Sequence, residues 1–192
     1  MKLLIRGGSI AAGYGVARGY VDILRDYCTP AGIELINKSR PGDNSFDGVW
    51  FFDEDINPHQ PDILILHFGM DDAFASVYRS EFKENLVNMI RMSRTRFNPV
   101  IVLPTSHILD NPHEMEAVHI YYRTIREVSL DLECLMIPVH TFWAGFLVEK
   151  SISNTDLLQK DARYPNEKGH EVYADIIVRT VERLLAARQK QH

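Results

Sequence analysis

The sequence is 192 residues long, and at about 150 residues per domain this length predicts a single domain over residues 1–192. Its composition is 45% hydrophobic and 24% charged, which is typical of a globular protein and excludes disordered, collagen-like and coiled-coil chains. The formal net charge is −5, so the chain lacks the basic excess of a nucleic-acid-binding protein.

Short apolar runs alternate with segments of helical period along the chain. Leu3–Ile5 is the first apolar run, and a helix is predicted after it, near Val16–Cys28, where apolar residues recur every three or four positions. The remaining pattern predicts strands at 33–36, 62–69, 99–104 and 134–139, and helices near 80–94, 111–130 and 166–188. Five strands alternating with helices favour the α/β class, as a flavodoxin-like three-layer α/β/α sandwich with a five-stranded parallel sheet.

The N-terminal segment and the cysteines bear on the cellular compartment. Arg6 ends the first apolar run after three residues, which is too short for the core of a signal peptide. No run approaches the roughly 18 apolar residues of a membrane span. Cys28 and Cys134 are far apart and predict two reduced thiols rather than a disulfide framework. We therefore expect a cytoplasmic protein with no membrane span.

Polar residues follow the predicted strands, at the sheet edge where open parallel sheets bind ligands. The segments are 7–9, 38–45, 69–72, 105–107 and 140–142, rich in Gly, Ser, Asp and His. Ser9 stands on a sharp strand-to-helix turn, which suits stabilisation of an oxyanion or binding of a phosphate. The nucleotide motifs are incomplete, because no Gly-Lys-Ser/Thr is present and Arg18 replaces the third glycine of a dinucleotide fingerprint. We therefore expect no cofactor.

Four segments resemble, in order, the sequence blocks of the SGNH (GDSL-type) hydrolases. They are Gly7-Gly8-Ser9-Ile10 with Gly13-Tyr14-Gly15, then Pro41-Gly42-Asp43, then Gly69-Met70-Asp71-Asp72, and Asp161 to His170 before the last helix. The resemblance implies a serine ester hydrolase with Ser9 as nucleophile and Gly42 as an oxyanion-hole donor. It also implies that the partner is a small-molecule ester, acyl or sugar-like ligand, and that no metal or cofactor is needed.

Three positions depart from the family pattern. Gly8 stands where the family has Asp, Asp71 where it has the oxyanion-hole Asn, and Tyr164 where it has the catalytic His; Asp161, which would orient that histidine, is retained. A phenol with a reference pKa of about 10 is a poor base at neutral pH, and an ionised carboxylate donates no hydrogen bond to an oxyanion. We therefore predict impaired or non-standard esterase catalysis.

Several alternatives remain open from the sequence. His107 or His140 follows a strand at the same edge and could replace the missing base. Asp71, Asp72 and Asp161 could form an acidic cluster that holds a hard cation, as in a metal-dependent hydrolase. The chain could also be a non-catalytic binding or scaffold protein that has kept the fold. The sequence specifies neither the substrate nor the oligomeric state.

Overall fold

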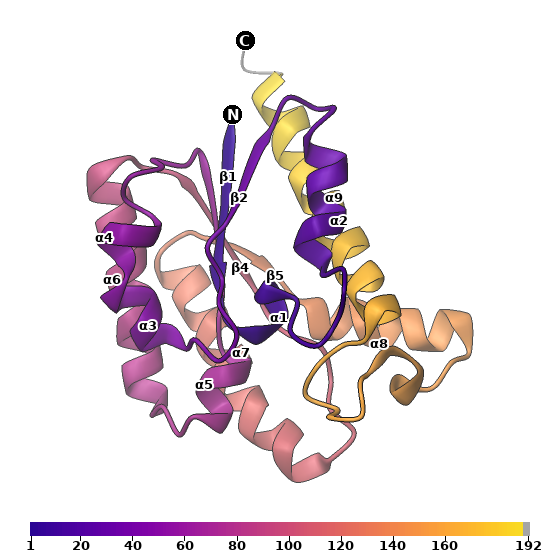
Figure 1. Cartoon of the computed structure of the whole chain (residues 1–192). Coiled ribbons are helices and arrows are strands. Elements are labelled where there is room, and N and C mark those ends of the chain that lie inside the picture. The colour runs from indigo at the N-terminus through magenta and orange to yellow at the C-terminus, as the bar shows by residue number, and fades with distance from the viewer. Residues whose placement is uncertain (190–192) are drawn as a thin grey trace.

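The computed structural model describes residues 1–189 and is built around a five-stranded parallel sheet (Figure 1). The strands are β1 (Lys2–Gly7), β2 (Glu34–Asn37), β3 (Ile63–His67), β4 (Val100–Pro104) and β5 (Leu135–Ile137). Their order across the sheet is β2-β1-β3-β4-β5, the flavodoxin-like order that the sequence predicted. Because the chain leaves β1 toward one side and returns to its other side as β3, strand order reverses between β1 and β3, where such sheets bind ligands.

Alternate residues of the central strands enter two separate cores. Leu3, Ile5, Ile63 and Ile65 face one side of the sheet, whereas Leu4, Leu64 and Leu66 face the other. Side chains of a strand point alternately to its two faces, so strands covered on both faces must be apolar throughout. This requirement explains the nearly continuous apolar runs in the sequence.

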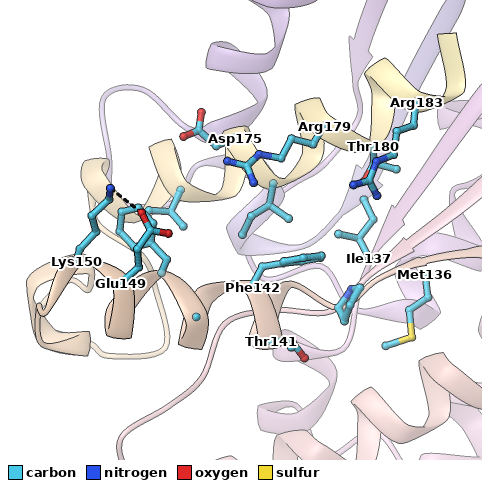
Figure 2. Close-up of a pocket in the computed structure, with 15 residues that line it drawn as sticks. Met136, Ile137, Thr141, Phe142, Glu149, Lys150, Asp175, Arg179, Thr180 and Arg183 are labelled. Carbon is cyan, nitrogen blue, oxygen red and sulfur yellow. Dashed lines mark hydrogen bonds and ion pairs between the residues drawn. The ribbon is translucent and has the colours of Figure 1, made fainter. Parts of the chain in front are cut away.

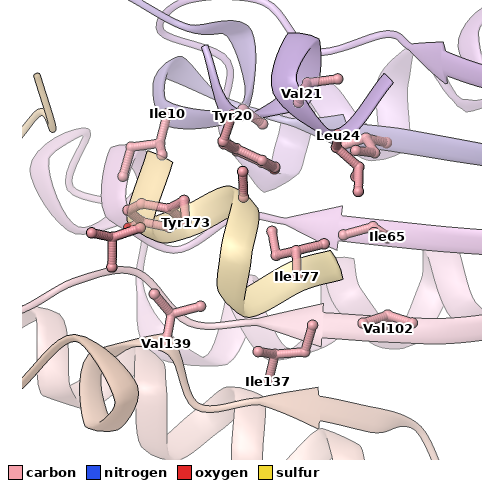
Figure 3. Close-up of a cluster of buried hydrophobic side chains, with 14 of the residues drawn as sticks. Ile10, Tyr20, Val21, Leu24, Ile65, Val102, Ile137, Val139, Tyr173 and Ile177 are labelled. Atoms are coloured by element: carbon pink, nitrogen blue, oxygen red, sulfur yellow. The ribbon is translucent and has the colours of Figure 1, made fainter. Parts of the chain in front are cut away.

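Helices cover both faces (Figure 1). On the first face lie α1 (Ser9–Ala12), α2 (Tyr20–Cys28), α8 (Val139–Lys150) and α9 (Glu167–Gln189), and Figure 3 shows part of the core that they enclose. The second face is covered by α4 (Phe52–Asp55), α6 (Arg79–Arg96) and α7 (Pro112–Asp131). Short helices α3 (Ser45–Trp50) and α5 (Met70–Phe74) and the 3-10 turn η1 (Asn154–Leu157) complete the described elements.

Helix α8 and the short elements α3, α4, α5 and η1 were not predicted, and two predicted elements have other bounds in the structure. The helix predicted from Val16 begins only at Tyr20, because residues 16–18 form bends and Gly19, in an extended conformation, is the N-cap of the helix. The strand predicted over 134–139 ends at Ile137, and Val139 already begins α8. No helix in the described part of the chain is long and apolar enough to cross a membrane.

Candidate active site

The first three blocks meet beyond the carboxyl ends of β1, β2 and β3. Ser9 begins α1 two residues after β1, and its side chain is buried. Asp71 lies in α5, just after β3, and Gly42 lies in the turn after β2. β1 pairs with β3 so that Gly7 is opposite His67, and this register places Ser9 beside the start of α5.

The polar groups of Ser9 are joined to Asp71 and Gly42. The Ser9 hydroxyl donates to Asp71 Oδ1 at 2.6 Å, and the Ser9 backbone N–H donates to Asp71 Oδ2 at 2.8 Å. The Gly42 N–H donates to Ser9 Oγ at 2.9 Å. The Asp71 carboxylate therefore accepts hydrogen bonds from both the Ser9 hydroxyl and the Ser9 backbone N–H. An oxyanion would otherwise use that N–H.

Gly8 leaves the space that the Asp71 carboxylate fills. A Cβ atom at position 8 would overlap with Asp71 Oδ2 and with the backbone carbonyl of Asp43. The φ angle of Gly8 is −96°, which any residue can adopt, so glycine is required here by close approach rather than by backbone conformation. The two departures from the family pattern at positions 8 and 71 are thus linked, because the Asp71 carboxylate lies where a side chain at position 8 would lie.

A buried ion-pair network holds the turn that carries Gly42. Arg6, which is fully buried in β1, contacts Asp43 at 2.5 Å and Asp55 at 3.1 Å. Asp55 also accepts two hydrogen bonds from Arg40, both at 2.7 Å. Gly42 itself has a φ of 83°, a left-handed conformation that favours glycine. These contacts fix the turn so that its N–H points at Ser9.

Sequence reasoning missed this network. The available signal was Arg6, an arginine inside an otherwise apolar strand and directly before the serine turn. A buried guanidinium needs carboxylate partners, so this position indicated an ion pair near the site. The sequence pattern presents Arg6 only as the end of an apolar run, because its partners Asp43 and Asp55 are distant along the chain.

Tyr164 lies close enough to Ser9 and Asp71 for both side chains to influence its pKa. Its ring contacts Tyr14 edge-on, with centroids 4.9 Å apart. Burial, followed by the Asp71 charge, raises the pKa of Tyr164, and the Ser9 side chain lowers it by a smaller amount. The phenol is therefore protonated at neutral pH and is a poor acceptor for the serine proton.

Asp161 does not support Tyr164 through its side chain. Its carboxylate accepts from Arg163 Nε at 2.9 Å and Arg163 Nη2 at 2.6 Å, and these bonds lower the pKa of Asp161. Only the Asp161 backbone carbonyl contacts Tyr164, whose N–H donates to it. The residue expected to orient a base is engaged by an arginine instead.

Both histidines considered as substitute bases are bonded elsewhere. His107 is fully buried, and its Nδ1 lies 2.9 Å from the Tyr173 hydroxyl; burial lowers the pKa of His107 to about 4. His140 Nδ1 lies 2.8 Å from the Thr105 hydroxyl. Neither forms a hydrogen bond with Ser9 in the described structure.

The three aspartates proposed as a cation site do not converge. Asp72 is buried and accepts from the Ser45 and Gly69 N–H groups, both at 2.9 Å. Asp71 is held by Ser9, and Asp161 by Arg163. Within residues 1–189 no group of three or more His, Cys, Asp or Glu side chains is arranged to hold a metal ion, so the acidic-cluster expectation is wrong.

Burial and neighbouring charge act on the Asp71 carboxyl. Burial raises its pKa, the two bonds from Ser9 lower it, and the nearby Asp43 raises it. An ionised Asp71 makes the site unfavourable for a negatively charged ligand, so the geometry suits a neutral or cationic one.

Related proteins carry the same architecture. A catalytic mutant of an acetylxylan esterase from Geobacillus stearothermophilus superposes with a TM-score of 0.80 at 20% identity, covering 93% of this chain and 92% of that one. A lipase/acylhydrolase from Enterococcus faecalis gives a TM-score of 0.77 at 23% identity, with 94% of both chains covered. At these identities the likeness establishes the fold.

Sequence comparisons establish the family. An arylesterase from Vibrio mimicus is 26% identical over 106 residues, and the match spans about half of each protein, 53% of this chain and 53% of the relative. The sequence profile of the GDSL-like lipase/acylhydrolase family matches residues 6–172, which contain all four blocks. This chain belongs to the GDSL-like lipase/acylhydrolase family.

Proposed function

We propose that Ser9 lies at a binding site for a small ester, acyl or sugar-like ligand, and that ordinary serine-esterase turnover at this site is severely reduced. The observation that carries the proposal is the Asp71 carboxylate, which accepts from both the hydroxyl and the backbone N–H of Ser9. Family membership supports the ligand class, and this hydrogen bonding supports the loss of turnover.

The first weakness of the site is its base. A serine hydroxyl needs a positioned group to take its proton, and loss of a general base costs about 10²- to 10⁴-fold in rate. Tyr164 has a raised pKa and stays protonated at neutral pH. The Asp71 carboxylate can accept the proton. A carboxyl has a reference pKa of about 3.9, against about 6.5 for imidazole, so it starts as the weaker base, and burial raises the pKa of Asp71 from that value.

The second weakness is the oxyanion hole. The Gly42 and Ser9 N–H groups would be its remaining donors, yet the Ser9 N–H is occupied by Asp71 Oδ2. A negative charge beside a developing oxyanion is also repulsive. Loss of one donor typically costs about 10²- to 10³-fold, and the two defects need not multiply because such groups act together.

A non-catalytic role is the second candidate. The same three hydrogen bonds satisfy Ser9 without any substrate, which is the state expected of a serine that serves recognition or structure. In that case the site binds the neutral or cationic ligand and leaves its ester bond intact.

Hydrolysis of p-nitrophenyl acetate by the purified protein and by Ser9→Ala tests the proposal. We expect the two values of kcat/KM to agree within a few-fold, and we expect no labelling of Ser9 by a fluorophosphonate probe. Rapid hydrolysis that disappears in Ser9→Ala would refute the proposal and show that another group activates the serine.

Binding is tested separately from turnover. The amide signals of Ser9 and Gly42 in a ¹⁵N-labelled sample should shift when peracetylated xylose, a neutral acylated sugar, is added. Asp71→Asn removes the charge and is expected to allow acetate to bind there as well. Absence of any shift with the acylated sugar and with p-nitrophenyl acetate would favour a scaffold without a ligand.

A further inference from the structure

A groove lies at the β5 edge of the sheet, between α8 and α9 (Figure 2). Its volume is about 620 Å³, within the roughly 300–1,000 Å³ of small-molecule sites. β5 is separated from β1 by β3 and β4, which corresponds to about 14 Å at about 4.8 Å per strand. The groove is therefore distinct from the Ser9 site.

The floor and one wall of the groove are apolar. Ile137 of β5, Phe142 and Phe146 of α8 and Ile176 of α9 line it. Phe142, one of these lining residues, is 48% exposed. A helix that is apolar around its circumference is normally buried on all sides, so this surface of α8 fits an apolar occupant.

A glycine inside α8, Gly145, also points to an occupant of the groove. It lies in the middle of α8 and lines the groove, and a Cβ atom built there would have no neighbour within 4 Å. A glycine inside a helix costs about 1 kcal/mol relative to alanine, and no contact within the described chain accounts for it. Its effect is to leave bare backbone as part of the groove wall.

Two arginines lie along the opposite wall. Arg179 and Arg183 are one helical turn apart on α9, and both guanidinium groups point toward the space above Phe142 and Ile137 (Figure 2). Neither forms a salt bridge with a described residue, although Arg179 is close enough to Glu149 to lower the pKa of that carboxyl. Glu149 itself is paired with Lys150 at 2.9 Å.

We propose that this groove binds a medium-chain carboxylate, with its apolar chain across Phe142, Gly145 and Phe146 and its head group between Arg179 and Arg183. Guanidinium groups match carboxylates in charge and shape, and the apolar floor provides surface for the chain. Two carboxylates also line the groove, Glu149, which is paired with Lys150, and Asp175. The apolar wall beside two arginines that form no salt bridge with a described residue still favours an anionic amphiphile over a neutral one.

Equilibrium dialysis with radiolabelled octanoate tests the proposal, with 1-octanol and octylamine as matched neutral and cationic probes. We expect octanoate to bind about tenfold more tightly than 1-octanol, a preference that weakens at high salt because the arginines are exposed. Octylamine should bind least well. Ser9→Ala should leave octanoate binding unchanged, since the negative Asp71 disfavours an anion in that site.

Two variants test the two halves of the groove. Gly145→Leu fills the space with a side chain and removes a helix-interior glycine, so binding of octanoate and 1-octanol should both fall at least tenfold while thermal stability is kept. Arg179→Gln with Arg183→Gln should remove the tenfold preference for octanoate and leave 1-octanol binding intact. Arg123→Gln with Arg126→Gln makes the same charge change at exposed positions of α7 and serves as control.

Three outcomes would overturn the proposal. Equal binding of octanoate and 1-octanol would remove the role of the arginines. Octanoate binding that survives Gly145→Leu would place the ligand elsewhere. Failure of octanoate to bind, together with a dimer in sedimentation analysis that Gly145→Leu dissociates, would assign the groove to contact with a second copy of the chain.

Discussion

At the scale of single residues, the Gly8 and Asp71 pair decides the chemistry of the serine site. The Asp71 carboxylate fills the space where a side chain at position 8 would lie, and there it accepts from Ser9 twice. In comparison with the family pattern, a carboxylate next to the serine is therefore supplied from position 71 instead of position 8. The glycine at position 8 is explained by the position of the Asp71 carboxylate, and that carboxylate fits only because position 8 has no side chain.

Gly8→Ala should destabilise the protein. The added Cβ overlaps with Asp71 and with a backbone carbonyl, and overpacking of this kind costs about 1–3 kcal/mol. Urea unfolding measures the change. Gly145→Ala, which has open space around the new methyl group, should instead stabilise by about 0.5–1 kcal/mol. Equal effects of the two substitutions would contradict the packing argument.

Restoring two family side chains should increase esterase activity. Asp71→Asn replaces the acceptor with an amide that can donate to an oxyanion, and Tyr164→His supplies a base beside Ser9. The double variant is expected to gain at least tenfold in kcat/KM for p-nitrophenyl acetate, against the 10²- to 10⁴-fold that a fully positioned base would give. No gain would mean that Asp161, held by Arg163, cannot orient the new histidine.

At the scale of elements, β1 supplies both the serine turn and the cation that orders the neighbouring turn. Arg6 lies inside the sheet and binds Asp43 and Asp55 beneath the segment that presents Gly42. The network couples the end of β1, the turn after β2 and helix α4. Stability and site geometry are therefore linked through one buried side chain.

Arg6→Met should be strongly destabilising. It removes the fully buried one of the two arginines that pair with Asp43 and Asp55 and leaves only the half-exposed Arg40 beside them. Breaking a buried pair on one side costs about 3–5 kcal/mol, and the remaining Arg40 sets the expected loss at the lower end of that range. Arg18→Met removes an exposed partner of Asp26, for which about 0–1 kcal/mol is expected. Chemical denaturation of both variants gives the comparison, and a similar small loss in each would show that the network contributes little.

The sequence predicted the central strands β1, β3 and β4 because they are almost entirely buried and apolar. It predicted α6, α7 and α9 because each has a single apolar stripe. Helix α8 was missed. Its apolar residues surround the helix instead of following one stripe, so Phe142 and Trp143 resembled loop aromatics, whereas Trp143 is fully buried. The family blocks indicated Ser9, Gly42 and Asp71, but the shared space of Gly8 and Asp71 is a tertiary contact that no local pattern reveals.

At the scale of the whole molecule, a buried polar cluster lies behind the serine site. Tyr20 and Tyr173 are fully buried in the first core, together with His67, His107 and His170. His67 Nδ1 lies 2.9 Å from the Tyr20 hydroxyl, and His170 Nδ1 accepts from the Tyr20 N–H at 3.1 Å. Burial is the largest cause of the lowered histidine pKa values, about 3 for His67 and about 4 for His107 and His170.

This cluster should make the fold sensitive to mild acid. The three histidines bind protons below about pH 6.5 in the unfolded chain but only near pH 3–4 in the folded one. The unfolded state therefore binds more protons in this window, and stability falls as the pH falls. Asp72, with a pKa raised to about 6 by burial, acts in the opposite direction and offsets about one proton.

These four groups together differ by about two protons near pH 5, and that difference alone corresponds to a loss of about 2–3 kcal/mol per pH unit. Urea unfolding at pH 7 and pH 5 measures it. His170→Gln keeps an acceptor for the Tyr20 N–H but cannot be protonated, so it should reduce the slope by about one proton. A free energy of unfolding that stays constant from pH 7 to pH 5 would mean that the histidines titrate alike in both states, which requires water to reach a cluster that the two helices α2 and α9 enclose.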